Sequence, residues 1–467
     1  MSRGRDENDF FAMRWCTLLL LGWFLLAPAS SAARPPNIVF IMADDLGYGD
    51  LGCYGQRVIE TPRLDRMAQE GTRFTTCYAG STVCAPSRSV LMTGLHTGHT
   101  TVRGNFGVGG VKGLGGGAGR VPLRSEDVTV AEILKEAGYV TGMSGKWGLG
   151  EPKTTGEPNG QGFDEWFGFL NQRRAHDHYP EFLWHNRKRV MLPKNHGGKE
   201  GTYSHDLFTD FAVDFVKRHR EERFFLYLPY CVPHAKYQMP PEGALFEDKP
   251  WKRNEKSHAA MVTRLDRDVG RLLDLLDELN LSERTLVFFC SDNGAAERWE
   301  GRFDSSGPLR GRKRDLTEGG LRVPMIVRWK GAVPAGRVSD LPWWFADFLP
   351  TCAVLAGKEE PVGLDGMSIV SALKGGNLPL RPGPDGKREP SRHFYWEFHE
   401  GGFQQAVRWM DWKAIRSGPN KPLRLYNLKK DLGENRDLAA EHPEIAKKMR
   451  ALLTSARTES KEWPVQR

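Results

Sequence analysis

Short apolar runs alternate with amphipathic stretches along most of this chain, and this alternation limits the folds open to it more than any other feature. Runs rich in β-branched and aromatic residues predict buried strands at 37–43, 139–144, 224–230, 286–291 and 323–329. Helical patterns lie between them, at about 61–71, 129–137, 204–219 and 257–279. The alternation is typical of an α/β fold, in which helices cover both faces of a largely parallel sheet.

The length of the chain, 467 residues, favours one large domain and a smaller one. After about residue 350 the alternation weakens, and a stretch rich in Gly, Pro and Lys at 374–390 precedes a last helix expected at 443–455. We therefore predict a large domain over residues 34–350 and a smaller C-terminal α+β subdomain over residues 351–467.

The first 33 residues have the pattern of an export signal. Three arginines precede an apolar run at 17–26, and small residues follow at 29–33. The apolar run is short for a bilayer span and no later segment reaches its length, so we predict cleavage after Ala33 and no permanent membrane span. The protein is expected to be periplasmic or extracellular, or to enter the secretory and lysosomal route in a eukaryote.

Charge and cysteine content narrow the class of partner. The formal net charge is +8, which favours an anionic partner, but no long run of Lys and Arg occurs. An exported chain of this kind is better suited to a charged glycan or a small anionic ester than to nucleic acid, which we do not expect as a partner. The six cysteines beyond the signal are widely spaced, so they predict neither a disulfide framework nor a zinc site.

Acidic and amide side chains follow two of the predicted strands. Asp44 and Asp45 come directly after the first strand, and Asp292 and Asn293 follow the strand at 286–291. Because ligands bind at the carboxyl ends of parallel strands, we expect these side chains, together with Lys146 and His234 after two other strands, to face one crevice. Two adjacent carboxylates repel each other unless a cation lies beside them, and ligands that offer only oxygen favour calcium over magnesium or zinc.

The segment Cys84-Ala85-Pro86-Ser87-Arg88, followed by SVLMTG at 89–94, is the most specific motif of the chain. It resembles the signature of the type I sulfatases, a family in which this cysteine is converted to formylglycine (3-oxoalanine). The resemblance extends strongly over 36–324 and more weakly over 425–438. It implies an alkaline-phosphatase-like α/β/α sandwich with a large, mixed, mostly parallel sheet.

The resemblance also assigns roles to individual residues. It implies one calcium ion per chain, held by Asp44, Asp45, Asp292 and Asn293 beside the modified residue 84. The positions that match the polar sulfate-binding and proton-transfer residues of the family are Arg88, Lys146, His234 and Lys313. Conversion of Cys84 would require a partner, either a formylglycine-generating enzyme or an anaerobic sulfatase-maturating enzyme.

The function implied is hydrolysis of a sulfuric ester with release of inorganic sulfate, from a sulfated carbohydrate. A hydrated aldehyde has two hydroxyls, so one can attack sulfur while deprotonation of the other later expels sulfate. Aromatic and basic residues at 163–184 suit a sulfated sugar, or else pack beneath a long loop. The glycine-rich stretch at 104–119 is expected to be a loop near the site.

One position departs from the family pattern. Gly148 stands where the family usually has a histidine that assists the formylglycine hydroxyl. We expect His176 or His178 to assist the formylglycine hydroxyl in place of that histidine. Two alternatives stay open: a phosphate or phosphonate ester hydrolase of the same superfamily, and a noncatalytic protein that binds sulfated glycans.

Overall fold

The computed structural model describes residues 34–114, 117, 119–297, 299–378, 381–382, 388–389 and 392–465. The predicted export signal at 1–33 lies outside these ranges. From Pro35 onward the chain forms one compact unit, and the boundary expected near residue 350 stays a prediction. Within the described ranges, every helix is too short or too polar to cross a bilayer.

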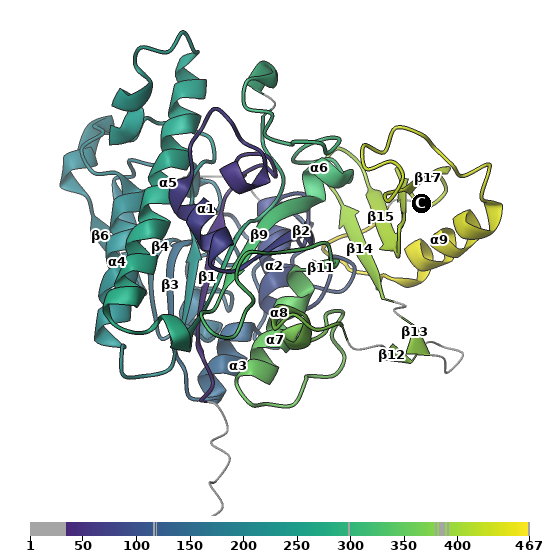
Figure 1. Cartoon of the computed structure of the whole chain (residues 1–467), viewed down its shortest axis with the longest axis horizontal. Coiled ribbons are helices and arrows are strands. Elements are labelled where there is room, and N and C mark those ends of the chain that lie inside the picture. The colour runs from purple at the N-terminus through teal and green to yellow at the C-terminus, as the bar shows by residue number, and fades with distance from the viewer. Residues whose placement is uncertain are drawn as a thin grey trace, which may run out of the picture. The chain divides into compact units, whose positions relative to one another are not determined.

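The main sheet of the described chain has eleven strands (Figure 1). These are β1 (Asn37–Ala43), β2 (Thr72–Tyr78), β3 (Val140–Lys146), β4 (Glu165–Phe169), β5 (Phe182–His185), β6 (Lys188–Met191), β7 (Phe224–Pro229), β8 (Thr285–Ser291), β9 (Arg322–Arg328), β10 (Arg337–Ser339) and β11 (Trp343–Trp344). They run in the order β10-β2-β9-β8-β1-β7-β3-β4-β5-β6, and β11 also pairs with β2.

The centre of this sheet, β8-β1-β7-β3-β4, is parallel throughout. β9 runs antiparallel to both β8 and β2, and β4, β5 and β6 pair in antiparallel fashion at the other end. The predicted fold class, an α/β sandwich with a large, mixed, mostly parallel sheet, is confirmed.

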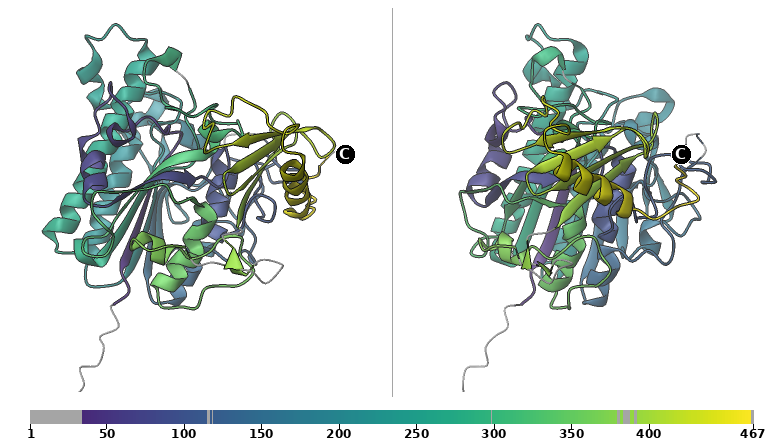
Figure 2. Two further views of the ribbon diagram at one scale, coloured as in Figure 1. Left: turned by 45° about the vertical axis from the view of Figure 1, so that its right-hand side comes forward. Right: turned by 90° about the vertical axis from the view of Figure 1, so that its right-hand side faces the viewer.

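Strand β1 shows why both faces are covered by helices. All its residues are buried, as expected for a parallel strand with a nearly continuous apolar sequence. Ile38, Phe40 and Met42 enter one core, whereas Val39 and Ile41 enter the core on the opposite face. Helices α2 (Cys84–Thr93), α3 (Val130–Glu136) and α7 (Phe348–Leu355) cover the first face. Helices α1 (Pro62–Gln69), α4 (Ser204–Arg218) and α5 (Arg253–Glu278) cover the second (Figure 2).

Helix boundaries follow local capping chemistry. Pro62 occupies the first turn of α1, where its missing N–H costs nothing. Thr129 and Glu132 form a reciprocal capping box at the start of α3. Two further helices are short, α6 (Glu318–Leu321) and α8 (Val370–Leu373).

The C-terminal part contains a small antiparallel sheet. It is formed by β14 (His393–Phe398), β15 (Gln404–Trp409), β16 (Trp412–Arg416) and β17 (Leu423–Asn427), and α9 (Pro443–Ser455) packs against it. Strands β12 (Arg381–Pro382) and β13 (Arg388–Glu389) pair separately. From β16, Lys413 forms ion pairs with Glu318 of α6 at 2.8 Å and with Glu434 at 3.1 Å, and all three side chains are buried.

Candidate functional site

The predicted crevice lies at the carboxyl ends of the central strands. Ala43 at the end of β1 pairs with Ser291 at the end of β8, so Asp44 and Asp292 leave the sheet at the same level. The backbone N–H of Asp45 donates to Oδ1 of Asp292 at 3.2 Å. Lys146 ends β3, and the loop after β7 carries His234 to the same place.

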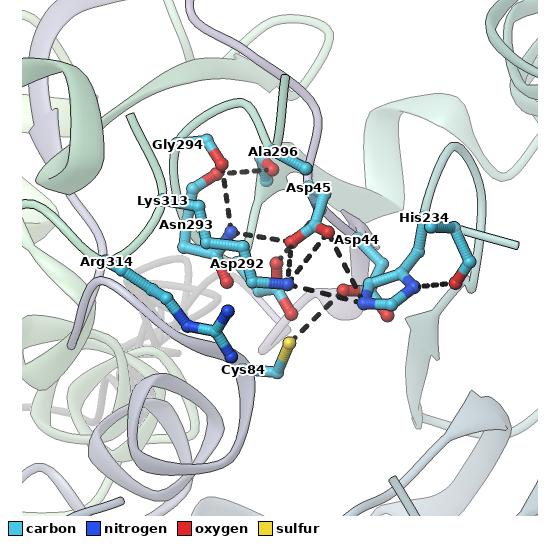
Figure 3. A network of polar contacts seen from close by, with 12 residues as sticks. Asp44, Asp45, Cys84, His234, Asp292, Asn293, Gly294, Ala296, Lys313 and Arg314 are labelled. Carbon is cyan, nitrogen blue, oxygen red and sulfur yellow. Dashed lines mark hydrogen bonds and ion pairs between the residues drawn. The ribbon is translucent and has the colours of Figure 1, made fainter. Parts of the chain in front are cut away.

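Cys84 is the first residue of α2 and lies in this crevice (Figure 3). Its Sγ lies 3.5 Å from Oδ1 of Asp44, and 4% of the residue is exposed. Burial, followed by the negative charge of Asp44, raises the pKa of the Cys84 thiol to about 12. The thiol is therefore protonated near neutral pH and is a weak nucleophile as it stands.

Two lysines and a histidine hold the adjacent carboxylates. Nζ of Lys146 donates to Asp44 at 2.5 Å, and Nζ of Lys313 donates to Oδ2 of Asp45 at 2.8 Å. Nε2 of His234 lies 3.3 Å from Asp45 Oδ2 and 3.3 Å from Nζ of Lys313. Burial alone would raise the pKa of both aspartates, but the nearby cations outweigh it and lower each pKa below its ordinary value.

Arg88 lies one helical turn after Cys84 and is buried completely. Its guanidinium donates to Oδ2 of Asp292 at 2.7 and 3.2 Å, and to the backbone carbonyl of Lys146 at 2.5 Å. Despite the hydrogen bonds from Arg88, burial and then the negative charge of Asp44 raise the pKa of Asp292 to about 7. Arg88 thus fixes two strand ends relative to the helix that carries residue 84.

The donor set of the crevice fits a hard cation. Oδ1 of Asn293 is buried and has no hydrogen-bond partner among the residues that the structure describes, while its Nδ2 donates to Asp45 at 2.8 Å. Ligand atoms of Asp44, Asp45, Cys84 and His234 all lie within 4.8 Å of one another. An unpaired buried amide oxygen beside clustered carboxylates is the environment that a calcium ion would satisfy. The structure thus brings together all nine sequence-predicted positions: Asp44, Asp45, Cys84, Arg88, Lys146, His234, Asp292, Asn293 and Lys313.

The space beside Gly148 is filled by Gln172. Gly148 has φ of +79°, and a Cβ added there would lie 2.1 Å from Nε2 of Gln172. Any side chain at 148 would therefore collide with the Gln172 carboxamide as it lies here. Gln172 was not among the residues predicted from the sequence. Gln172 contacts Gly148 because of the way the loop after β4 folds, and no sequence motif predicts this contact.

The two histidines proposed as substitutes both lie against His234. The ring of His176, at the end of the 3₁₀ turn Arg174–His176, has its centroid 4.3 Å from that of His234. Nε2 of His178 lies 3.0 Å from the backbone carbonyl oxygen of His234. Burial, more than any other cause, lowers the pKa of His176 to about 3 and of His178 to about 4, so both are neutral near pH 7.

Comparisons with known proteins agree with this geometry. The profile of the family described as Sulfatase matches residues 36–358. The chain is 36% identical to N-acetylgalactosamine-6-sulfatase of Canis lupus familiaris over 391 residues, which cover 79% of this chain and 72% of that protein. It is 34% identical to arylsulfatase A of Homo sapiens over 473 residues, 91% of this chain and 89% of that one. Among solved structures, Ps i-CgsB in complex with k-i-k-neocarrahexaose is similar, with a TM-score of 0.78, 30% identity, and coverage of 92% and 95% of the two chains.

Proposed function

This chain belongs to the sulfatase family and is a sulfuric ester hydrolase, and we propose that it releases sulfate from a sulfated carbohydrate with a formylglycine at position 84 and one calcium ion. The observation that carries the proposal is the placement of Cys84 at the start of α2, against Asp44 and beside Asp292 and Asn293. A protonated, buried thiol makes a poor nucleophile, which favours chemical conversion of this side chain over direct attack by sulfur.

Formylglycine and calcium would each supply one part of the chemistry. A hydrated aldehyde at 84 would offer one hydroxyl to attack sulfur and a second whose deprotonation lets sulfate leave. A calcium ion held by Asp44, Asp45, Asp292 and Asn293 would favour ionisation of the attacking hydroxyl and offset charge on a sulfate oxygen.

Lys146 and Lys313 provide fixed positive charge for the substrate. Burial alone would lower the pKa of both, but the neighbouring carboxylates outweigh it and raise each pKa above its ordinary value. Both lysines therefore stay protonated across the physiological range. Charge on a transferring sulfate group spreads over its oxygens, so each ammonium would contribute a few kcal/mol, about 3, of transition-state stabilisation.

His234 and Lys313 form the pair best placed to protonate the leaving oxygen. Nδ1 of His234 contacts the carbonyl oxygen of Ala235, and a proton on Nδ1 leaves Nε2 to accept from Nζ of Lys313. Burial lowers the pKa of His234, so the ring is neutral at rest. The negative charge of a bound sulfate ester would favour a proton on Nε2, taken up from solvent, and Nε2 would then pass that proton to the leaving alcohol while Lys313 keeps its own.

A sulfated carbohydrate is proposed as the substrate on two grounds. One relative is named N-acetylgalactosamine-6-sulfatase, and one similar structure is a complex with k-i-k-neocarrahexaose. The net charge of +8 suits an anionic glycan. Export and a maturation enzyme acting on Cys84 belong to the same proposal.

Two measurements test it. Mass spectrometry of the peptide containing residue 84 should show loss of the thiol and gain of an aldehyde. Release of sulfate from 4-nitrophenyl sulfate should then far exceed release of phosphate from 4-nitrophenyl phosphate, and should fall when calcium is chelated. An intact thiol in fully active protein would refute the formylglycine, and a preference for the phosphate ester would refute the sulfatase chemistry.

A further inference from the structure

Arg314 follows Lys313 in the chain and has an unusual backbone conformation for its residue type. Its φ is +77°, in the left-handed region that glycine adopts without steric cost. Its N–H donates to the carbonyl oxygen of Thr82 at 3.1 Å, and the hydroxyl of Thr82 donates to the carbonyl oxygen of Asp315 at 2.9 Å. A bulky residue held in this conformation beside the site indicates a functional role. None of the roles assigned above uses Arg314.

The guanidinium of Arg314 forms an ion pair with Glu400. Nε and Nη2 lie 3.1 and 3.0 Å from Oε2 of Glu400. Figure 3 shows this guanidinium directed toward Cys84. Glu400 follows β14, so the small C-terminal sheet supplies one member of the pair. We call Arg314 and Glu400 the rim pair.

The rim pair is tied to the backbone on both sides of residue 84. Oε1 of Glu400 accepts from Nδ2 of Asn105 at 2.7 Å, and Oδ1 of Asn105 accepts from the N–H of Ala85 at 3.4 Å. On the other side, the N–H of Arg314 bonds to Thr82. Residue 84 therefore lies between the two attachments, and the rim pair borders the place where a substrate would meet it.

The rim pair is open to solvent and balanced in charge. The side chain of Arg314 is 62% exposed and that of Glu400 21% exposed, so a sugar has room to approach. An exposed ion pair contributes little to stability, so stability does not explain the left-handed backbone of Arg314. Among the described residues, Nη1 of Arg314 makes no hydrogen bond. The pair thus offers free N–H donors beside carboxylate acceptors, with little net charge.

We propose that the rim pair binds hydroxyl groups of the sugar, next to the sulfate that is cleaved. The proposal rests on the proposed function, because it takes the cleaved ester to lie at residue 84. A hydroxyl both donates and accepts a hydrogen bond, so Arg314 would donate to its oxygen and Glu400 would accept from it or from its neighbour. A second anionic substituent would be repelled by Glu400. The two residues therefore determine specificity for an uncharged, hydroxyl-bearing sugar face.

Rates of sulfate release by the full-length, matured protein test this inference. The sugar probes are N-acetylgalactosamine 6-sulfate, N-acetylgalactosamine 4-sulfate and galactose 6-sulfate, and the reference ester is 4-nitrophenyl sulfate, which carries no hydroxyl. For the sugar cleaved fastest, Arg314→Gln and Glu400→Gln should each lower kcat/KM at least about tenfold more than for the reference ester. Arg436→Gln, whose exposed side chain pairs with Glu441, is the matched control and should keep the ratio.

Deoxy analogues of that sugar test whether the contact is direct. In each analogue one free ring hydroxyl is replaced by hydrogen. The analogue that lacks the bound hydroxyl should lose about tenfold in kcat/KM with the unsubstituted protein, but less than about twofold with Arg314→Gln, because its partner is already gone. A residue that only supports the fold would leave the two losses equal.

A second variant separates binding from folding. Arg314→Gly removes the guanidinium and relieves the left-handed backbone, so thermal unfolding should show an intact protein that still loses the preference for the sugar. Equal losses on the sugar and the reference ester would overturn the inference, as would equal losses on the deoxy analogues. Cleavage of the reference ester but of none of the sugars would overturn it as well. If the unsubstituted protein releases no sulfate from the reference ester, the proposed function itself fails.

Discussion

Oδ1 of Asp44 lies 3.5 Å from the sulfur of Cys84, while Oδ2 of the same carboxylate accepts from Nζ of Lys146 at 2.5 Å. One carboxylate thus joins the first turn of α2 to the end of β3, across the end of β1. A group built onto residue 84 would lie beside an oxygen of the same carboxylate that binds the Lys146 ammonium. Because α2, β3 and the end of β1 share the Asp44 carboxylate, the site forms only when all three segments are folded together.

Replacing Cys84 by alanine should abolish sulfate release while leaving the fold intact. The side chain is small, and among the described residues its thiol makes a single weak polar contact, so little stability depends on it. Turnover should fall by about three orders of magnitude or more, because no other side chain can take the place of the nucleophile. Ion chromatography of sulfate and thermal unfolding measure the two effects. Cys53→Ala, a half-buried free thiol elsewhere, is the control, and equal loss in both variants would contradict the assignment.

Calcium should stabilise the protein through Asn293. Oδ1 of this residue is buried without a hydrogen-bond partner among the described residues, and burial, then the charge of Asp44, raises the pKa of Asp292, so a cation bound beside both would stabilise them. Adding calcium at 100 times its dissociation constant should stabilise the native state by about 2.7 kcal/mol. Thermal unfolding with and without a chelator measures this shift, which should shrink in Asn293→Ala. A melting temperature that changes neither with added calcium nor with chelator would argue against a calcium site.

The sequence predicted strands β1, β3, β7, β8 and β9 and the positions of the candidate metal ligands, because each is encoded locally. The bounds of β1 and α9 agree with the structure, since a continuous apolar run and a proline-led amphipathic run leave few alternatives. Asp44 and Asp292 were placed correctly relative to each other because both follow parallel strands. The Cys84 motif then marked the helix beside them.

The edge strands and the contact between Gly148 and Gln172 were not predicted, for physical reasons. All the residues of β6 are exposed, so it has no apolar pattern, and β10 and β11 are too short to show a period. The contact between Gly148 and Gln172 joins loops that follow different strands. Only tertiary packing brings these two residues together.

Lys413 should be essential for the stability of the C-terminal sheet. Its ammonium lies between Glu318 and Glu434, and all three groups are buried. Lys413→Met would take the cation away from buried Glu434 and leave Glu318 with its ion pair to Arg322 at 3.4 Å, so the free energy of unfolding should fall by about 3 kcal/mol. Urea denaturation measures it, with Lys430→Met on the surface as the control. A loss below about 1 kcal/mol would mean that the carboxylates find other partners or become protonated.

His96 should make the protein less stable in acid. Burial, more than any other cause, lowers the pKa of His96 from 6.5 to about 3, and its Nδ1 accepts from the N–H of Gly98 at 3.1 Å. The unfolded chain therefore binds a proton below pH 6.5 that the folded chain does not bind until about pH 3. Stability is complete above pH 6.5 and declines as the pH falls towards the folded pKa.

The contribution of His96 can be isolated from the way the free energy of unfolding changes with pH. Between pH 6.5 and pH 5, neutral His96 should lower the free energy of unfolding by about 2 kcal/mol, and the His96→Gln variant should not show this decrease. Urea denaturation at several pH values compares the variant with the unsubstituted protein. Parallel stability curves for the two proteins would contradict the prediction.

His176 and His178 should affect turnover in different ways. The ring of His176 stacks 4.3 Å from that of His234, whereas Nε2 of His178 bonds to the backbone of His234. His176→Ala should lower kcat about tenfold and change the pH–rate profile, because it removes a neutral base beside the site. His178→Ala should act through the position of the His234 loop, so Gln at 178, which restores a donor, should recover most activity. Gly148 offers no side chain, so His176 and His178 are the histidines that we expect to assist the hydroxyl at residue 84. Full turnover in both alanine variants would exclude that role.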